Sequence, residues 1–472
     1  MSPNPLAPGW LVEPSDANAL PDSVWSRSAH RDEAGALVVG GVSVADLVRE
    51  YGTPLYVLDE DDARSRAAEA RAAFDSEFAR IGTTAKVYYA GKAFLSADVA
   101  RWVSAAGLKV DICTGGEFAV AQAAGVDPSQ MGFHGNNKSL AEIDRTVAAG
   151  IGAIVVDSPA EVDRVADAAE RHGVVQPVRV RVNSGVHAST HEYLATARED
   201  QKFGITLTDT PEVVAAIRRR PSLAFLGLHS HIGSQIFGAD GFVEAARRLL
   251  TVHAALLADG PVPELNLGGG FGIAYTSVDD APAIGELARA LADIVGAECA
   301  RLGIDVPVLA VEPGRIVIGP STTTLYTVGT LKDVQVATGE GDGSAVRRYV
   351  SVDGGMSDNA RPALYGADYS VRMVNRASSA SPALVRVAGK HCESGDIVVL
   401  ADYLPGDVAP GDILGVPATG AYCWSLSSNY NHVGRPAVVA VRDGGSRVIV
   451  RGETEADILA RDAGLDTTNG RA

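Results

Sequence analysis

The chain has 472 residues, more than one compact core usually holds, so the length predicts two domains. A net charge of −17 argues against nucleic acid or an anionic membrane as the partner, and 46% hydrophobic with 21% charged residues is ordinary for a globular protein. The four cysteines show no CxxC pairing and no metal-ligand spacing, which predicts free thiols and no bound metal. Without a signal-peptide pattern or an apolar run of transmembrane length, we expect a soluble, cytoplasmic protein.

The first part of the chain predicts an arm followed by short strands and a helix. Residues 1–35 are rich in Pro, Ser, Asp and Ala, which indicates an irregular and partly mobile arm with Trp10 and Trp25 as possible anchors. Residues 36–56 contain short β-type runs, which we expect to join a β domain formed later in the chain. The Ala/Arg/Glu-rich stretch 61–81 predicts a helix.

A repeating pattern of short apolar runs and Ala-rich amphipathic segments fills residues 57–319. Runs too short for helices, bounded by glycine and helical segments, are typical of buried parallel strands. Eight such runs predict a (β/α)8 TIM-type barrel, so the fold class is α/β plus β. A doubly wound sheet is the alternative, but no glycine fingerprint opens the first helix. The eight runs are 86–90, 108–112, 131–135, 153–157, 178–182, 225–229, 264–268 and 308–312.

The pattern changes near residue 320. From there to residue 472, β-branched and alternating runs are separated by Gly, Asp and Pro turns, which predicts a second, mainly antiparallel β domain. A helix over 453–461 is expected near its end.

Polar side chains stand at most predicted strand ends. In a barrel of this kind the site is built at the carboxyl ends of the strands, so we expect these side chains to face one mouth. One of them, Lys92, taken alone, is more typical of a lysine that extends from a strand end into water. The residues concerned are Lys92, Asp111, His134, Asn136, Asn137, Asp157, Arg181, Asn183, His229, His231, Gly268, Gly269, Gly270, Glu312 and Arg315.

Four of these features together describe a pyridoxal-phosphate site. The glycines at 268–272 allow backbone N–H groups to approach a phosphate, although a flexible loop is the alternative. His229 and His231 can be interpreted as two core histidines, or a histidine here can stack on an aromatic cofactor. As a zinc pair they lack an obvious third ligand. Glu312 suits a pyridine nitrogen and Arg315 a substrate carboxylate, with an internal Glu–Arg ion pair as the alternative. Lys92 then supplies the amine that forms an imine with the cofactor.

Several motifs resemble those of the fold-type III pyridoxal-phosphate decarboxylases, with alanine racemase-like barrels, and most closely the diaminopimelate decarboxylase family. The resemblance covers roughly residues 37–455, and its motifs stand in the family's order. It implies decarboxylation of meso-2,6-diaminopimelate to L-lysine and CO2, the last step of lysine biosynthesis. The motifs are YYAGKAF, HSHIGSQ, LNLGGGFG, EPGR, DGGMSDNARPALYGA, HCESGD and GAYCWSLSSNYN.

The resemblance also implies a role for each motif residue. Lys92 would form the imine with pyridoxal 5'-phosphate, and Cys392 would protonate the carbanion left by the departing carboxyl group. The remaining cofactor contacts would be His231, Ser234, Gly268, Gly269, Gly270, Glu312, Pro313, Gly314, Arg315 and Tyr422. The substrate contacts would be Arg315, Arg361, Tyr365, Glu393 and Tyr422. In the family Cys392 and Glu393 come from the second protomer of a head-to-tail homodimer.

Three other functions stay open at this point. The runner-up is another basic amino-acid or carboxylated-polyamine decarboxylase of the same fold. A racemase is less expected because HCESGD belongs to the decarboxylase pattern. A non-catalytic homologue that acts as a binding regulator would be expected to lack the imine lysine or the acid, and this chain retains Lys92 and Cys392.

Overall fold

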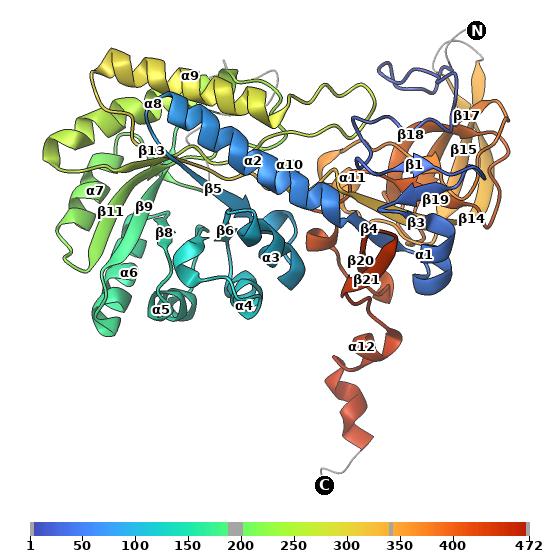
Figure 1. The fold of residues 1–472 in the computed structure, drawn as a ribbon. Coiled ribbons are helices and arrows are strands. Elements are labelled where there is room, and N and C mark those ends of the chain that lie inside the picture. The colour runs from blue at the N-terminus through green and yellow to red at the C-terminus, as the bar shows by residue number, and fades with distance from the viewer. Residues whose placement is uncertain (1–3, 187–201, 339–342, 469–472) are drawn as a thin grey trace. The chain divides into compact units, whose positions relative to one another are not determined.

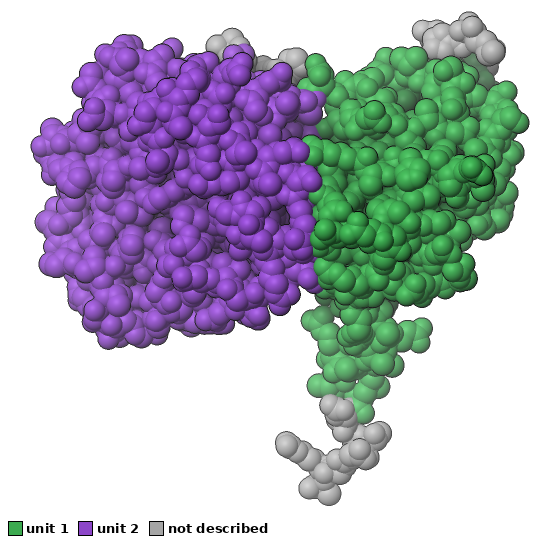
Figure 2. All heavy atoms as spheres, viewed as in Figure 1, with its two compact units in different colours: residues 1–63, 274–280, 318–472 green, residues 64–273, 281–317 purple. Residues whose placement is uncertain are grey.

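The computed structural model describes residues 4–186, 202–338 and 343–468. The chain divides into two compact units (Figure 2). The first comprises Met1–Ala63, Ala274–Asp280 and Ile318–Ala472, and the second comprises Arg64–Ile273 and Ala281–Val317. The chain therefore passes between the units more than once.

The second unit is a closed barrel of eight parallel strands, which confirms the predicted fold class (Figure 1). Strand β5 lies between β13 and β6, and the barrel closes where β8 pairs with β9. This closure excludes the doubly wound sheet, whose edges stay open. The strands are β5 (Ala85–Ala90), β6 (Lys109–Ile112), β7 (Met131–Phe133), β8 (Ala153–Val156), β9 (Gln176–Asn183), β11 (Leu223–His229), β12 (Glu264–Asn266) and β13 (Val308–Val311).

Helices cover the outside of the barrel (Figure 1). Their ends follow from local sequence: Ser139 and Glu142 form a capping box at the start of α5, and Gly173 ends α6 in the left-handed conformation. None of the helices within the described ranges is long and apolar enough to cross a membrane. The helices are α2 (Glu60–Arg80), α3 (Ala97–Ala105), α4 (Gly115–Ala123), α5 (Leu140–Ala148), α6 (Pro159–His172), α7 (Thr210–Arg218), α8 (Asp240–Leu256) and α9 (Ile284–Leu302), with the short pieces β10 (Ile205–Thr206) and α10 (Arg315–Ile318).

The first unit is organised on a mainly antiparallel sheet. Strand β4 (Leu55–Asp59), from the start of the chain, pairs antiparallel with β14 and parallel with β20. The other strands of this sheet are β14 (Thr322–Ala337), β15 (Ser344–Val352), β16 (Arg372–Met373), β17 (Pro382–Ala388), β18 (Ile397–Pro405), β19 (Ile413–Val416), β20 (Ala437–Arg442) and β21 (Gly445–Val450). Around it lie β1 (His30–Arg31), β2 (Leu37–Val39), β3 (Val42–Ser43), α1 (Val44–Tyr51), α11 (Arg361–Tyr365) and α12 (Glu455–Leu459).

The irregular segment before β1 packs onto the first unit. Trp25 is almost fully buried, whereas Trp10, the other expected anchor, is only half-buried. The Asn18 side chain donates to the Ser378 carbonyl oxygen at 2.9 Å, and the Asn18 carbonyl oxygen accepts from Arg31 Nε of β1 at 2.8 Å. Side-chain contacts, rather than helices or strands, therefore hold this segment.

An ion-pair network with a buried centre joins barrel strands β5, β9 and β12. The Arg179 guanidinium donates to Glu264 Oε2 from Nη2 at 2.6 Å and from Nε at 3.1 Å, and also to the Tyr88 hydroxyl at 2.9 Å. Lys86 donates to the other Glu264 oxygen. Both partners of the Arg179–Glu264 pair are at most 5% exposed, so neither charge could be stabilised by water if the other were removed.

We expect Glu264→Ala to destabilise the protein by about 3–5 kcal/mol, because it leaves a buried guanidinium without its carboxylate. Urea unfolding followed by circular dichroism measures the shift. The matched control is Asp293→Ala, whose carboxylate pairs with Arg80 at the surface, and its expected cost is about 0–1 kcal/mol. Equal shifts in the two variants would contradict the interpretation.

Candidate active site

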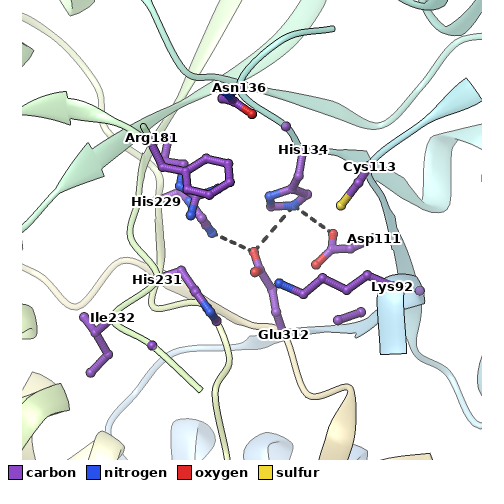
Figure 3. A pocket seen from close by; sticks show the side chains of 15 residues that line it. Lys92, Asp111, Cys113, His134, Asn136, Arg181, His229, His231, Ile232 and Glu312 are labelled. Atoms are coloured by element: carbon purple, nitrogen blue, oxygen red, sulfur yellow. Dashed lines mark ion pairs between the residues drawn. The ribbon is translucent and has the colours of Figure 1, made fainter. Parts of the chain in front are cut away.

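A cavity of about 460 Å³ opens at the carboxyl ends of the barrel strands (Figure 3). Most of the polar residues predicted at this mouth line it: Lys92, Asp111, His134, Asn136, Arg181, His229, His231 and Glu312. Asp157 is not among the lining residues and instead lies 3.8 Å from Arg181. The other predicted residues that do not line the cavity are Asn137, Asn183, Gly268, Gly269, Gly270 and Arg315. Cys113, Phe203 and Ile232 also line the cavity and were not predicted there.

Glu312 is the centre of the polar contacts in the cavity. Its Oε1 accepts a hydrogen bond from Asn266 Nδ2 at 2.7 Å. The same oxygen lies 3.0 Å from His229 Nε2 and 3.5 Å from His134 Nε2, as Figure 3 shows. Burial alone would raise the pKa of Glu312, but the two histidines outweigh it and hold this pKa well below its ordinary value. The structure therefore keeps an ionised carboxylate in the cavity.

Asp111 lines the same cavity, but its pKa is shifted in the opposite direction to that of Glu312. Its Oδ1 lies 3.1 Å from His134 Nε2, but neither carboxyl oxygen accepts an aligned hydrogen bond from a described residue. Burial, followed by the negative charge of Glu312, raises the pKa of Asp111 well above its ordinary value. The pKa values of these two carboxyl groups are thus shifted in opposite directions, a separation typical of functional sites.

Lys92 enters the cavity directly after β5, on the short 3-10 turn η1 (Gly91–Ala93). A Cβ at Gly91 would lie 2.7 Å from the Asp111 carbonyl oxygen, so only glycine lets this turn pass so close to β6. The Ala90 N–H donates to the Pro313 carbonyl oxygen at 3.1 Å, which links the end of β5 to the EPGR motif after β13. The lysine is therefore held next to Glu312 by backbone contacts.

The glycines at 268–270 pack against the backbone of neighbouring strand ends. A Cβ at Gly269 would lie 2.1 Å from the Glu312 carbonyl oxygen, and Gly268 and Gly270 have φ angles of +71° and +110°. The Gly269 N–H donates to His231 Nδ1 at 3.3 Å. Burial lowers the pKa of His231 to about 3, so its ring is neutral at neutral pH. Beside this loop, Arg315 Nη2 donates to Ser234 Oγ at 2.8 Å.

Arg361 and Tyr365 of α11 lie in the first unit. The Arg361 guanidinium lies 4.3 Å from the Tyr275 ring centroid and 5.4 Å from that of Tyr369, whose hydroxyl accepts a hydrogen bond from it at 2.5 Å. Arg361 is buried, and no carboxylate of the described chain pairs with it, which suits an anionic ligand. Tyr365, on the same short helix, is 68% exposed.

Cys392, Glu393 and Tyr422 also belong to the first unit. The side chains of Cys392 and Glu393 are exposed, and the Cys392 N–H donates to Asn431 Oδ1 at 3.2 Å. Tyr422 has a φ of +64°, a rare conformation for a tyrosine. The roles that the sequence assigns to these residues stay predictions.

Three side chains of the cavity have the spacing of metal ligands. His134, His229 and Glu312 bring their ligand atoms within 4.8 Å of one another, so His229 does have two further donors nearby. His231, the expected second member of the pair, is not in this group. Sequence spacing could not show this cluster, because its members come from the ends of three separate strands.

The lining residues fit pyridoxal phosphate. Both Asp111 carboxyl oxygens and both His229 ring nitrogens are buried without an aligned hydrogen-bond partner among the described residues. A lysine amine, an ionised carboxylate and a neutral imidazole face the same cavity. These three groups suit an aldehyde, the N–H of a protonated pyridine and an aromatic ring, respectively.

Comparisons with known proteins agree with this site. Residues 64–319 match the family model described as the pyridoxal-binding domain of pyridoxal-dependent decarboxylases. A diaminopimelate decarboxylase of Mycobacterium tuberculosis is 51% identical over 93% of this chain and 98% of its own length. A diaminopimelate decarboxylase of Bacillus subtilis is 40% identical over 93% of this chain and 98% of its own length. The crystal structure of diaminopimelate decarboxylase from M. jannaschii in complex with L-lysine has a TM-score of 0.85 at 28% identity, covering 93% of this chain and 98% of its own.

The barrel and its lysine-lined cavity define a pyridoxal-binding enzyme. The chain belongs to the diaminopimelate decarboxylase family of pyridoxal-dependent decarboxylases.

The cavity also predicts how stability depends on pH. Burial lowers the pKa of His134 from 6.5 to about 4, so between these values the unfolded chain binds a proton that the folded chain does not. Stability contributed by this group is therefore complete above pH 6.5 and falls as the pH drops toward 4, by about 3 kcal/mol.

We expect His134→Gln to lose less stability than the wild type between pH 6.5 and pH 4. Urea unfolding at several pH values measures the difference. His172→Gln is the matched control, because His172 lies near the surface beside Asp144. An unchanged acid slope in His134→Gln would contradict the assignment of a neutral, buried ring.

Proposed function

We propose that this protein converts meso-2,6-diaminopimelate into L-lysine and CO2 with pyridoxal 5'-phosphate. The observation that carries the proposal is the convergence of Lys92, His231 and Glu312 on one cavity. It is supported by relatives named diaminopimelate decarboxylase that align with nearly the whole chain. This is the last step of lysine biosynthesis.

The barrel residues would hold the cofactor. Lys92 would bind its aldehyde carbon, the His231 ring would stack on its ring, and the ionised Glu312 carboxylate would keep its pyridine nitrogen protonated. The bound cofactor supplies an electron sink for the pair left when the carboxyl group departs. The phosphate contacts would be Ser234, Gly268, Gly269, Gly270, Pro313, Gly314, Arg315 and Tyr422.

The substrate carries two amino-acid ends, so a specific enzyme must bind the end that does not react. Guanidinium groups suit its carboxylate, and a carboxylate suits its ammonium group. Arg361 supports this assignment because it is buried without an acidic partner in the described chain. The proposed substrate contacts are Arg315, Arg361, Tyr365, Glu393 and Tyr422.

Cys392 is the proposed acid. When the bond to the carboxyl carbon breaks and CO2 leaves, the remaining electron pair takes the thiol proton, and the thiolate later recovers a proton from water. We propose a homodimer with shared sites, in which Cys392 and Glu393 serve the barrel of the second protomer. A thiol that must stay reduced suits the cytoplasm, where we place the enzyme.

Carbon dioxide release from separate substrates tests the proposal. Purified protein with added pyridoxal phosphate is expected to release CO2 from meso-diaminopimelate, and to do so poorly after the cofactor is removed. Release from ornithine, arginine or a carboxylated polyamine, with none from diaminopimelate, would instead support the runner-up. No release from any of them, with ligand binding retained, would support a binding regulator.

Replacement of Lys92 by alanine is expected to abolish turnover and the visible absorbance of the bound cofactor together, because both need the same amine. Absorbance spectra and the CO2 assay measure the two effects on one sample. Lys109→Ala is the control, because this half-buried lysine donates to Gln130 and does not line the cavity. Turnover retained in Lys92→Ala would refute the assigned role.

Mixing two inactive variants tests the shared site. Lys92→Ala and Cys392→Ala are each expected to be inactive, while a hybrid dimer contains one intact site. At random exchange about half of the dimers are hybrids, and each hybrid has one intact site of two. Mixing should therefore restore about a quarter of wild-type activity. Mass spectrometry first establishes that subunits exchange. No recovery after proven exchange would count against sites shared between protomers.

A further inference from the structure

Three loops of the first unit meet around the segment that carries Cys392. They contain the motifs DGGMSD (353–358), HCESGD (391–396) and SNYN (428–431). The Ser428 N–H donates to the Ser357 carbonyl oxygen at 2.9 Å, and the Lys390 N–H donates to the Gly354 carbonyl oxygen at 2.9 Å. The proposed reaction assigns roles to Cys392 and Glu393 but none to the surrounding polar side chains.

Asp396 joins two of these loops through backbone hydrogen bonds. Its Oδ1 accepts from the Met356 N–H at 2.6 Å, and its Oδ2 accepts from the His391 N–H at 2.7 Å. A Cβ at Gly355 or at Gly389 would lie 2.6 Å or 2.2 Å from this carboxylate, so both positions need glycine. Asp396 is itself 2% exposed. A buried carboxylate that accepts hydrogen bonds from backbone N–H groups of two loops holds those loops in a fixed arrangement.

Asn431 and Ser357 hold the other side of the turn. Asn431 Oδ1 accepts from the Cys392 N–H at 3.2 Å and lies 3.3 Å from His391 Nδ1. His391 Nε2 lies 2.8 Å from Ser357 Oγ, and its ring stacks on Tyr430 with centroids 5.3 Å apart. The backbone up to the Cys392 N–H is therefore held by these contacts, while the Cys392 side chain itself is exposed.

We propose that Asp396 and Asn431 are positioning residues that hold the turn over His391–Glu393, and with it the Cys392 thiol, in one place for proton transfer. The inference rests on the proposed function, because it concerns the acid of that reaction. A general acid must lie within hydrogen-bond reach of the atom that it protonates, so a shift of about 1 Å costs much of its effect.

Two substitutions remove these contacts. Asn431→Gly deletes the acceptor of the Cys392 N–H, and glycine adopts the φ of +52° at this position without strain. Asp396→Asn keeps the shape but replaces one acceptor oxygen by an amino group that faces an N–H donor. Asn431→Asp retains the acceptor and is the conservative rescue. Asp443→Gly, at an exposed turn with a φ of +51°, is the matched control for backbone freedom.

Steady-state CO2 release from diaminopimelate separates positioning from binding. Asn431→Gly and Asp396→Asn are expected to lower kcat about tenfold and to change KM less than about twofold. The expected loss is smaller than the rate enhancement of about 10²–10⁴ that a positioned general acid supplies, because the thiol itself remains. Asn431→Asp and Asp443→Gly are expected to match the wild type. Wild-type kcat in both test variants, or an equal rise in KM, would overturn the proposal.

A second measurement does not depend on turnover. Alkylation of Cys392 by iodoacetamide, followed by mass spectrometry, is expected to change about threefold or more in both test variants, because the thiol leaves its fixed surroundings. An unchanged rate would overturn the proposal. No CO2 release by the wild type would overturn the proposed function, while the alkylation rates would still test the positioning. Should Asp396→Asn fail to fold, Asn431→Gly, at an exposed position, carries the test.

Discussion

One buried negative charge determines the arrangement of the barrel mouth. Glu312 is ionised inside a protein interior, where an isolated carboxylate would be costly. Contacts from Asn266, His229 and His134 reduce that cost, and each comes from a different strand end. These contacts therefore depend on the register of the strands that carry them. A (β/α)8 barrel, whose closed sheet fixes every strand against two neighbours, meets this demand.

Glycines allow the loops after the barrel strands to approach one another closely around Glu312. Gly91, Gly269 and Gly314 each place backbone where any side chain would collide with a neighbouring strand end. The loops after β5, β12 and β13 can consequently pack against one another and bring Lys92 next to Glu312. The glycine-rich motifs thus serve packing within the protein as well as any contact with a phosphate. Loop flexibility, the alternative interpretation, disagrees with these contacts.

The sequence predicted the barrel well because its strands are short apolar runs with regular spacing, and all eight were found in the predicted places. It also predicted which strand ends carry polar side chains. It could not predict that Asp157 would face Arg181 outside the cavity lining, or that Phe203 would line it, because side-chain direction past a strand end depends on the loop. The contacts of Arg361 with Tyr275 were equally hidden, since 86 residues separate them in the chain.

The position of β4 has a consequence for synthesis of the chain. This strand, made within the first 60 residues, lies between β14 and β20, which leave the ribosome some 260 to 380 residues later. Its edges stay unpaired during most of translation, while the barrel, whose strands are contiguous, can already close. The nascent chain therefore carries an apolar strand, Leu55–Asp59, that a chaperone or a second chain can bind before its own partners exist.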